Sequence, residues 1–113
     1  MNEPITARIE LPCILRSPAS LEPKAQGVTE ELARDLLLLS LPPGPAAEAL
    51  RPGLALVVDI ELPVAEGRSA RFLECVAIVR SAQSIGDSVH FALDVASMNF
   101  IAPRTATGGR SLP

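Results

Sequence analysis

The sequence predicts an all-β protein that closes into a small barrel. Several segments place apolar residues at every second position, which is typical of strands with one buried face. Prolines and glycines separate these segments at short intervals, and little of the chain favours helix. With 113 residues the chain is long enough for one domain with a single core. A barrel is expected over a sandwich because closure removes exposed sheet edges.

The first predicted strand covers residues 5–16, where apolar and polar side chains alternate. Pro12 has no backbone N–H to donate to a neighbouring strand, so we expect it at an edge or a bulge. Residues 17–27 contain two prolines and end in a glycine. This composition predicts a loop.

Residues 28–41 fit both helix and strand. Residues 29–35 include good helix formers, and Thr29 resembles a helix start. Residues 36–39 instead form a short, continuous leucine run, which is typical of a buried strand. We expect a strand at 36–39 preceded by one irregular or helical turn, and whether 28–35 is helical or extended stays open. Residues 42–53 are rich in proline and glycine and predict a connecting loop with room for one helical turn.

A central hairpin is predicted between residues 50 and 80. Its first strand alternates strictly, with the apolar residues Leu54, Leu56, Val58, Ile60 and Leu62 on one face. Its second strand places Leu73, Cys75, Ala77 and Val79 on one face. Two strands alone are at best marginally stable, so they need partner strands from the rest of the chain.

The C-terminal part predicts one more clear strand and a tail. Residues 81–87 are expected to form a turn with Gly86 and Asp87 at its tip, and residues 88–95 form the strand. Residues 98–102 are expected to pack as a short closing segment. Residues 103–113 have the composition of a disordered tail, so the domain is expected to cover residues 1–102.

Composition and charge disfavour several partners. The net charge of −3 argues against a nucleic-acid or anionic-membrane surface. Three Phe with no Tyr or Trp make base stacking a poor binding mode. No apolar run is long enough for a membrane span, and the first residues lack the features of a signal peptide. We therefore expect a reduced, cytoplasmic protein in which Cys13 and Cys75 are buried thiols.

The sequence contains no catalytic or metal-binding pattern. His90, the only histidine, is expected to point outward from its strand, whereas Cys13 and Cys75 point inward. These three residues lack metal-ligand spacing, and no serine lies in a GxSxG motif. No glycine-rich phosphate loop is present. From the residues alone we expect a non-enzymatic β module without a metal or cofactor.

The order of the segments resembles the PilZ domain family over residues 5–100. The segments that carry the resemblance are RIELPCILR, VTEELARDLLLLSLPPG, LRPGLALVVDIELP, FLECVAIVR and GDSVHFALDV. The resemblance implies a six-stranded antiparallel barrel with short helical turns in its loops. It also favours strand for residues 36–39.

PilZ domains that bind cyclic di-GMP do so through an RxxxR motif and a [D/N]xSxxG motif, and both are degraded here. The arginine positions fall near Asn2 and Thr6, and Arg8 lies two residues out of place. The second motif falls near Glu30 and Leu32, without its serine or its glycine. Each lost charge-assisted bond removes roughly 1.5–3 kcal/mol. If cyclic di-GMP binds at all, the resemblance implies Arg8, Glu30 and Arg34 as its ligands.

These observations predict a PilZ-like signalling or protein-interaction module with weak or no cyclic di-GMP binding. Ile14, Val76 and Ile78 lie on the outer faces of their strands, which predicts a protein partner, a second copy or a terminal segment over them. Two alternatives remain open. One is a working cyclic di-GMP receptor that uses displaced arginines such as Arg8, Arg34 or Arg104. The other is an unrelated small barrel with a structural role.

Overall fold

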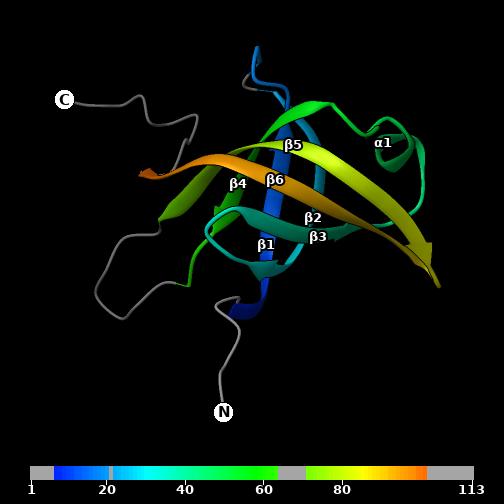
Figure 1. Ribbon diagram of the computed structural model, residues 1–113, viewed down its shortest axis with the longest axis horizontal. Coiled ribbons are helices and arrows are strands. Elements are labelled where there is room, and N and C mark those ends of the chain that lie inside the picture. Colours follow the sequence, from blue (N-terminus) through cyan, green and yellow to red (C-terminus); the bar gives the residue numbers. More distant parts are fainter. Residues whose placement is uncertain (1–6, 21, 64–70, 102–113) are drawn as a thin grey trace.

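A computed structural model of the chain describes residues 7–20, 22–63 and 71–101. Its elements are β1 (Ala7–Arg16), β2 (Pro23–Leu32), β3 (Leu36–Leu41), α1 (Pro45–Glu48), β4 (Ala55–Glu61), β5 (Phe72–Ile85) and β6 (Ser88–Ile101). The strands form a closed antiparallel barrel in the order β1-β2-β3-β6-β5-β4 (Figure 1). The structure confirms the predicted all-β class and the six-stranded barrel. The tail predicted at 103–113 lies outside the described residues and stays a prediction.

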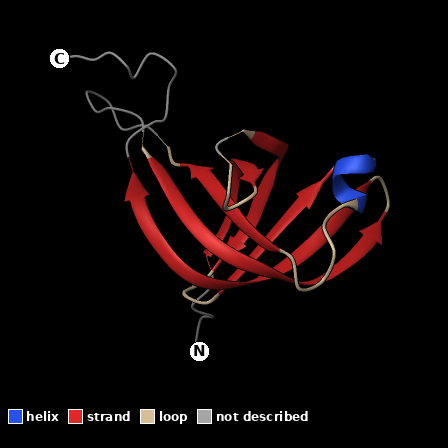
Figure 2. Ribbon diagram, turned by 90° about the horizontal axis from the view of Figure 1, so that it is seen from above, coloured by secondary structure: helices blue, strands red, loops and turns tan. Residues whose placement is uncertain are grey.

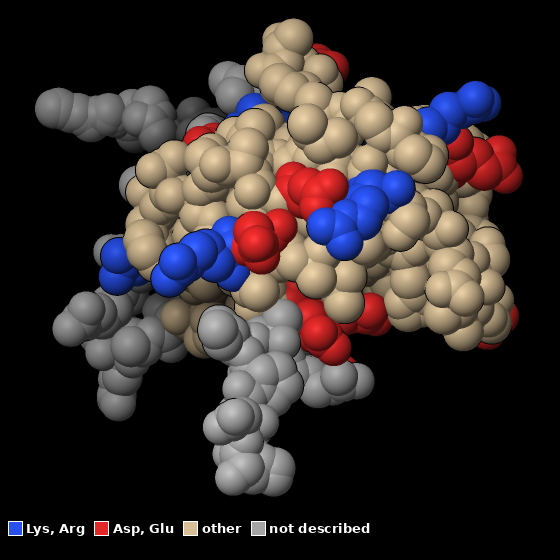
Figure 3. All heavy atoms as spheres, viewed as in Figure 1, with Lys and Arg blue, Asp and Glu red and all other residues tan. Residues whose placement is uncertain are grey.

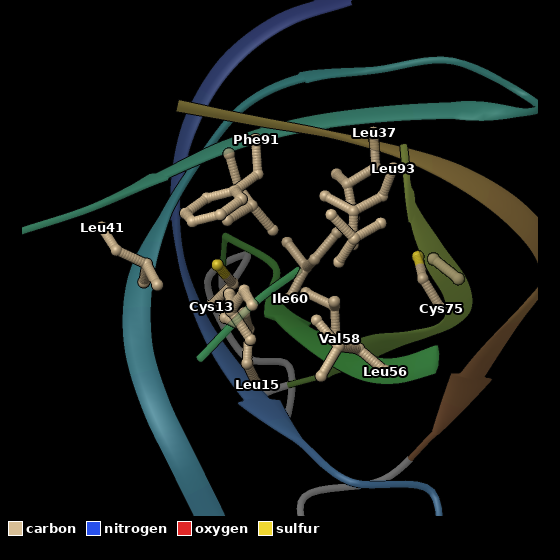
Figure 4. Packing of buried hydrophobic residues seen from close by; sticks show 14 of the residues in the cluster. Cys13, Leu15, Leu37, Leu41, Leu56, Val58, Ile60, Cys75, Phe91 and Leu93 are labelled. Atoms are coloured by element: carbon tan, nitrogen blue, oxygen red, sulfur yellow. The ribbon is translucent and has the colours of Figure 1, made fainter. Parts of the chain in front are cut away.

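The barrel interior is filled by aliphatic side chains from alternate positions of the strands. β4 and β5 supply the inward faces that the sequence predicts, and these residues are all buried: Leu56, Val58, Ile60, Leu73, Cys75, Ala77 and Val79. Phe91 of β6 is the one phenylalanine buried in the interior, where it packs among leucines (Figure 4). Full burial of each large aliphatic side chain contributes about 1.5–3 kcal/mol, so this core supplies much of the drive for closure.

The loop predicted at residues 17–27 is confirmed for the described residues before Pro23 and wrong from Pro23 onward, because β2 begins there and pairs with β1 over most of its length. Pro23 is tolerated as the first residue of the strand. Gly27 lets the strand approach its neighbour closely, since a Cβ atom there would lie 2.5 Å from the carbonyl oxygen of Ser40. The same two residues that predict a loop in the sequence therefore suit this strand: Pro23 begins it, and Gly27 lets it pack closely against its neighbour.

Residues 28–32 are extended, so the irregular or helical turn expected there is wrong. They complete β2, and a short turn at 33–35 leads to β3, which confirms the strand predicted at 36–39. The helix-forming residues are overridden because both flanking ladders need β2 as a partner. The single helical turn allowed within 42–53 is present as α1.

β5 and β6 form one long hairpin, so the turn predicted over 81–87 is wrong except at its tip. β5 continues to Ile85 and β6 starts at Ser88. Gly86 has φ +60 at the first central position of this two-residue turn, a position that favours glycine in hairpins. The short closing segment expected at 98–102 is also corrected, because β6 runs without interruption to Ile101.

The two hairpin strands are longer than their neighbours. β5 and β6 have 14 residues each, whereas β3 has 6 and β4 has 7. Figure 2 shows the long strands curving across the barrel, with α1 at one end. The hairpin therefore extends past the strands that flank it, which leaves part of its edges outside the closed ladder.

Candidate functional site

The structure places two of the three predicted nucleotide-binding residues at one end of the barrel. The backbone of Arg8 pairs with that of Glu31 where β1 begins. Arg34 is exposed in the turn at 33–35, which directly follows β2. Because Ala7 pairs with Leu32, the start of β1 and this turn are neighbours. The third residue, Glu30, points elsewhere.

Glu30 is engaged with His90 on the outer surface. It lies at a register irregularity between Thr29 and Glu31, and its Oε1 atom is 3.1 Å from Nδ1 of His90. The contact spans β3, whose Ser40 pairs with His90. Both side chains are about one-third exposed. The outward direction predicted for His90 is confirmed, and Glu30 is already occupied in a polar contact.

A buried charged cluster that sequence analysis did not identify lies on the outer face of β1, β4 and β5. Arg16 donates from Nε to Asp59 at 3.2 Å and from Nη2 to Glu74 at 2.8 Å. The side chain of Arg16 is only 7% exposed. Asp59 and Glu74 are directly opposite each other in the β4–β5 ladder, where like charges repel. The guanidinium of Arg16, on the neighbouring strand β1, contacts both carboxylates and offsets part of that repulsion.

This cluster serves the fold. Arg16 also donates from Nη1 to the carbonyl of Ser20 at 3.4 Å, so it ties the turn after β1 to the outer face. Directly opposite Arg16, Val57 is buried although it faces outward. The strand alternation already places all three charged residues on outer faces. Only the strand order reveals that they meet.

The two cysteines are free, buried and unsuited to nucleophilic chemistry. Burial raises the pKa of the Cys75 thiol to about 12. Burial also raises the pKa of the Cys13 thiol. Both thiols are therefore protonated at neutral pH, and a protonated thiol is a weak nucleophile and a weak metal ligand. Among the described residues, no group of three or more His, Cys, Asp or Glu is placed to hold a metal ion.

The outer apolar residues predicted from the sequence are only partly open to water. Ile78 is 45% exposed, whereas Ile14 and Val76 are half-buried. On the face seen in Figure 3, acidic and basic groups are interspersed on a largely uncharged surface. Arg80 and Asp94 form an exposed ion pair on the β5–β6 hairpin. No helix within the described residues has the length and hydropathy to cross a membrane.

The surface carries shallow hollows. One of about 160 Å³ lies over β1, β2, β4 and β5 beside the charged cluster. Another, of about 300 Å³, lies between α1 and the projecting β5–β6 hairpin and is lined mostly by apolar or small residues. The second reaches the lower end of the volume range typical of ligand-binding pockets.

Comparison with solved structures finds a similar fold in the Bacillus subtilis inhibitor of motility (MotI/DgrA), with a TM-score of 0.67 and 16% sequence identity. The match covers 84% of this chain and 42% of that chain, so this chain spans less than half of that protein's length. Comparisons with protein-family models and with curated proteins find no match. The PilZ-like barrel predicted from the sequence is confirmed as the fold. Membership of the family stays a prediction.

Proposed function

We propose that this protein is a non-enzymatic, PilZ-like regulatory module that acts through protein contacts and binds cyclic di-GMP weakly or not at all. The observation that carries the proposal is the shared fold with a protein that inhibits motility. Regulation by such a module requires a surface for a partner, and no chemistry at the barrel itself.

The surroundings of the residues predicted to contact the nucleotide support weak or absent cyclic di-GMP binding. Glu30 contacts His90, so its carboxylate would have to leave that contact before it could pair with a guanine edge. Residue 32, the position of the motif serine, is a leucine. Each missing hydrogen bond to a charged group removes roughly 1.5–3 kcal/mol of binding free energy.

A second candidate, a working cyclic di-GMP receptor, is favoured by one observation. Arg8 and Arg34 lie at the same end of the barrel, where β1 begins and β2 turns into β3. Arginine is suited to phosphates, because a guanidinium group can donate two parallel hydrogen bonds.

Calorimetric titration with cyclic di-GMP at low and at physiological salt separates the two candidates. The proposal expects no measurable heat at either salt. A Kd of about 10 µM or tighter would instead support the receptor. In that case Arg8→Ala and Arg34→Ala should each weaken binding, and Arg51→Ala, which replaces an exposed arginine in the loop before β4, serves as the matched control.

A further inference from the structure

β5 has a stretch of free edge beyond the end of β4. The β4–β5 ladder ends at the pair Ala55 and Ile78, and the last bonds on this side join Gly53 and Leu54 to Val79. From Ser81 to Ile85, β5 pairs with β6 alone. Within the part of the chain that the structure describes, no strand or loop makes backbone hydrogen bonds to the opposite edge of this segment. Its outward backbone groups are therefore available to another strand.

This free edge lacks charge and proline, two features that proteins commonly use to block unwanted strand pairing. Residues 81–85 read SAQSI, and all five are exposed. Ile85 is 52% exposed, which makes it one of the most exposed large apolar residues described. An uncharged, accessible edge of this kind is a template for strand addition.

A groove adjoins this edge on the inner side of the sheet. A register shift between Val79 and Ser81 changes the alternation of β5, so Ala82 and Ser84 lie opposite the inward-facing residues Phe91 and Val89. The groove has a volume of about 300 Å³. Its walls are formed by Ala82, Ser84 and Val89 on the hairpin and by Pro43, Gly44, Ala47, Glu48 and Leu50 at α1. A strand added to the edge would direct every second side chain into this groove.

The shape of the groove favours a single strand as its occupant. α1 lies beside β5 on the side away from β6 and bounds the groove there (Figure 1). A second copy of this chain would bring its whole β5–β6 hairpin and its own α1 to the same edge, which is far more bulk beside α1 than one extended segment. One extended segment needs only the width of one strand, about 4.8 Å from β5.

The charge of the groove indicates which side chains the bound segment should carry. Glu48 is the only charged residue among those that line it, and its carboxylate is exposed. The other lining residues are apolar or small. An occupant with apolar side chains at alternate positions and one basic side chain near Glu48 matches both the lining and the charge.

We propose that the free edge of β5 at Ser81–Ile85 binds an extended segment of a partner protein by strand addition. Alternate apolar side chains of the segment fill the groove beside α1, and a Lys or Arg pairs with Glu48. This assignment rests on the proposed function as a protein-interaction module and names the surface that carries it.

The probe for this proposal is a phage-displayed library of nine-residue peptides with Val, Ile or Leu at alternate positions, Ser or Thr between them, and one Lys near either end. Peptides selected on the immobilised full chain are then synthesised and titrated by fluorescence anisotropy. We expect binding that N-methylation of the edge-facing peptide amides weakens at least tenfold, because strand addition depends on backbone hydrogen bonds. Hydrogen exchange at residues 81–85 should slow when the peptide is bound.

Two matched variants test the position of the site. Ala82→Glu places a second carboxylate in the groove and should weaken binding at least tenfold. Gln83→Glu adds the same charge to the same strand on its other face and should change binding less than threefold. Glu48→Lys should reverse the preference, so that peptides with Glu in place of Lys bind more tightly. If Ala82→Glu does not fold by circular dichroism, Ser84→Glu replaces it.

Three results would overturn the proposal: a library that yields no binder, binding that Ala82→Glu and Gln83→Glu weaken equally, or a dimer by light scattering that Ala82→Glu converts to a monomer. The last result would assign the edge to a second copy. The proposed function has its own test in the cyclic di-GMP titration. A failed peptide selection together with a silent titration would therefore remove this surface and leave the regulatory module in place.

Discussion

Replacing Arg16 with methionine should destabilise the barrel strongly. The guanidinium of Arg16 bridges Asp59 and Glu74, and the three side chains are 7%, 12% and 19% exposed. Methionine retains much of the apolar stem, so the substitution tests the charge more than the packing. Two neighbouring carboxylates would lose the cation that they share, in a site with little access to water.

The magnitude follows from the burial of the pair. Removing one partner of a buried ion pair costs about 3–5 kcal/mol, and the partial exposure of Glu74 places this site near the lower end, about 3 kcal/mol. Urea unfolding should be followed by far-UV circular dichroism, because the chain has no Trp or Tyr for fluorescence. With a urea m-value of about 1.5 kcal/mol/M, the midpoint should fall by about 2 M.

Two controls separate this effect from the general loss of an arginine. Arg80→Met removes an exposed pair with Asp94, so its unfolding midpoint should stay close to that of the wild type. The triple variant Arg16→Met, Asp59→Asn, Glu74→Gln also replaces the two carboxylates with neutral amides. It should recover most of the unfolding free energy that Arg16→Met loses. If Arg16→Met shifts the midpoint no further than Arg80→Met, the cluster does not stabilise the fold and the reasoning is refuted.

Three further predictions concern the core. Gly27→Ala should cost about 1–3 kcal/mol in urea unfolding, because the new Cβ would lie 2.5 Å from the backbone oxygen of Ser40; an unchanged midpoint would show that the strands can separate freely. Phe91→Ala should cost about 3–5 kcal/mol because Phe91 is 1% exposed, whereas Phe100→Ala, at a site 65% exposed, should cost far less; equal losses would contradict the assigned core. Burial raises the pKa of Cys75 from 9.0 to about 12, so the thiol ionises at lower pH in the unfolded chain than in the folded one. The contribution of this thiol to the free energy of unfolding should therefore be fully present below pH 9 and be lost between pH 9 and 12. Thermal melts across this pH range should show a smaller fall in Tm for Cys75→Ala than for the wild type. Identical profiles of Tm against pH for the two proteins would exclude this thiol as a cause.

Sequence periodicity predicted the strands that have one strictly apolar face. β4 places Leu56, Val58 and Ile60 at every second position, and the structure buries all three completely. The alternation of β6 likewise placed Phe91 and Leu93 inside and His90 outside. These predictions succeeded because a side-chain period of two defines a buried face whatever the partner strand is.

Strands without such a face were missed. The N-terminal half of β2 carries Pro23, Lys24 and Gln26, all exposed, so its sequence has the composition of a loop. The end of β5 at 81–85 has only small or polar residues until Ile85 and shows no apolar period. Both segments are extended because a neighbouring strand offers them backbone hydrogen bonds, which local propensity does not encode.

The sequence by itself determined the all-β class, the aliphatic core and the inward cysteines, since each depends on residue type and local spacing. Only the tertiary structure decided that Arg16 forms ion pairs with Asp59 and Glu74 and that Glu30 contacts His90. It alone also decided that β5 extends past the end of β4, which leaves a free edge. Each of these depends on strand order and register, which bring together residues more than 40 positions apart in the first two cases. The physical reason is that backbone ladders join strands without regard to their distance in the chain, so contacts across the barrel are settled only when it closes.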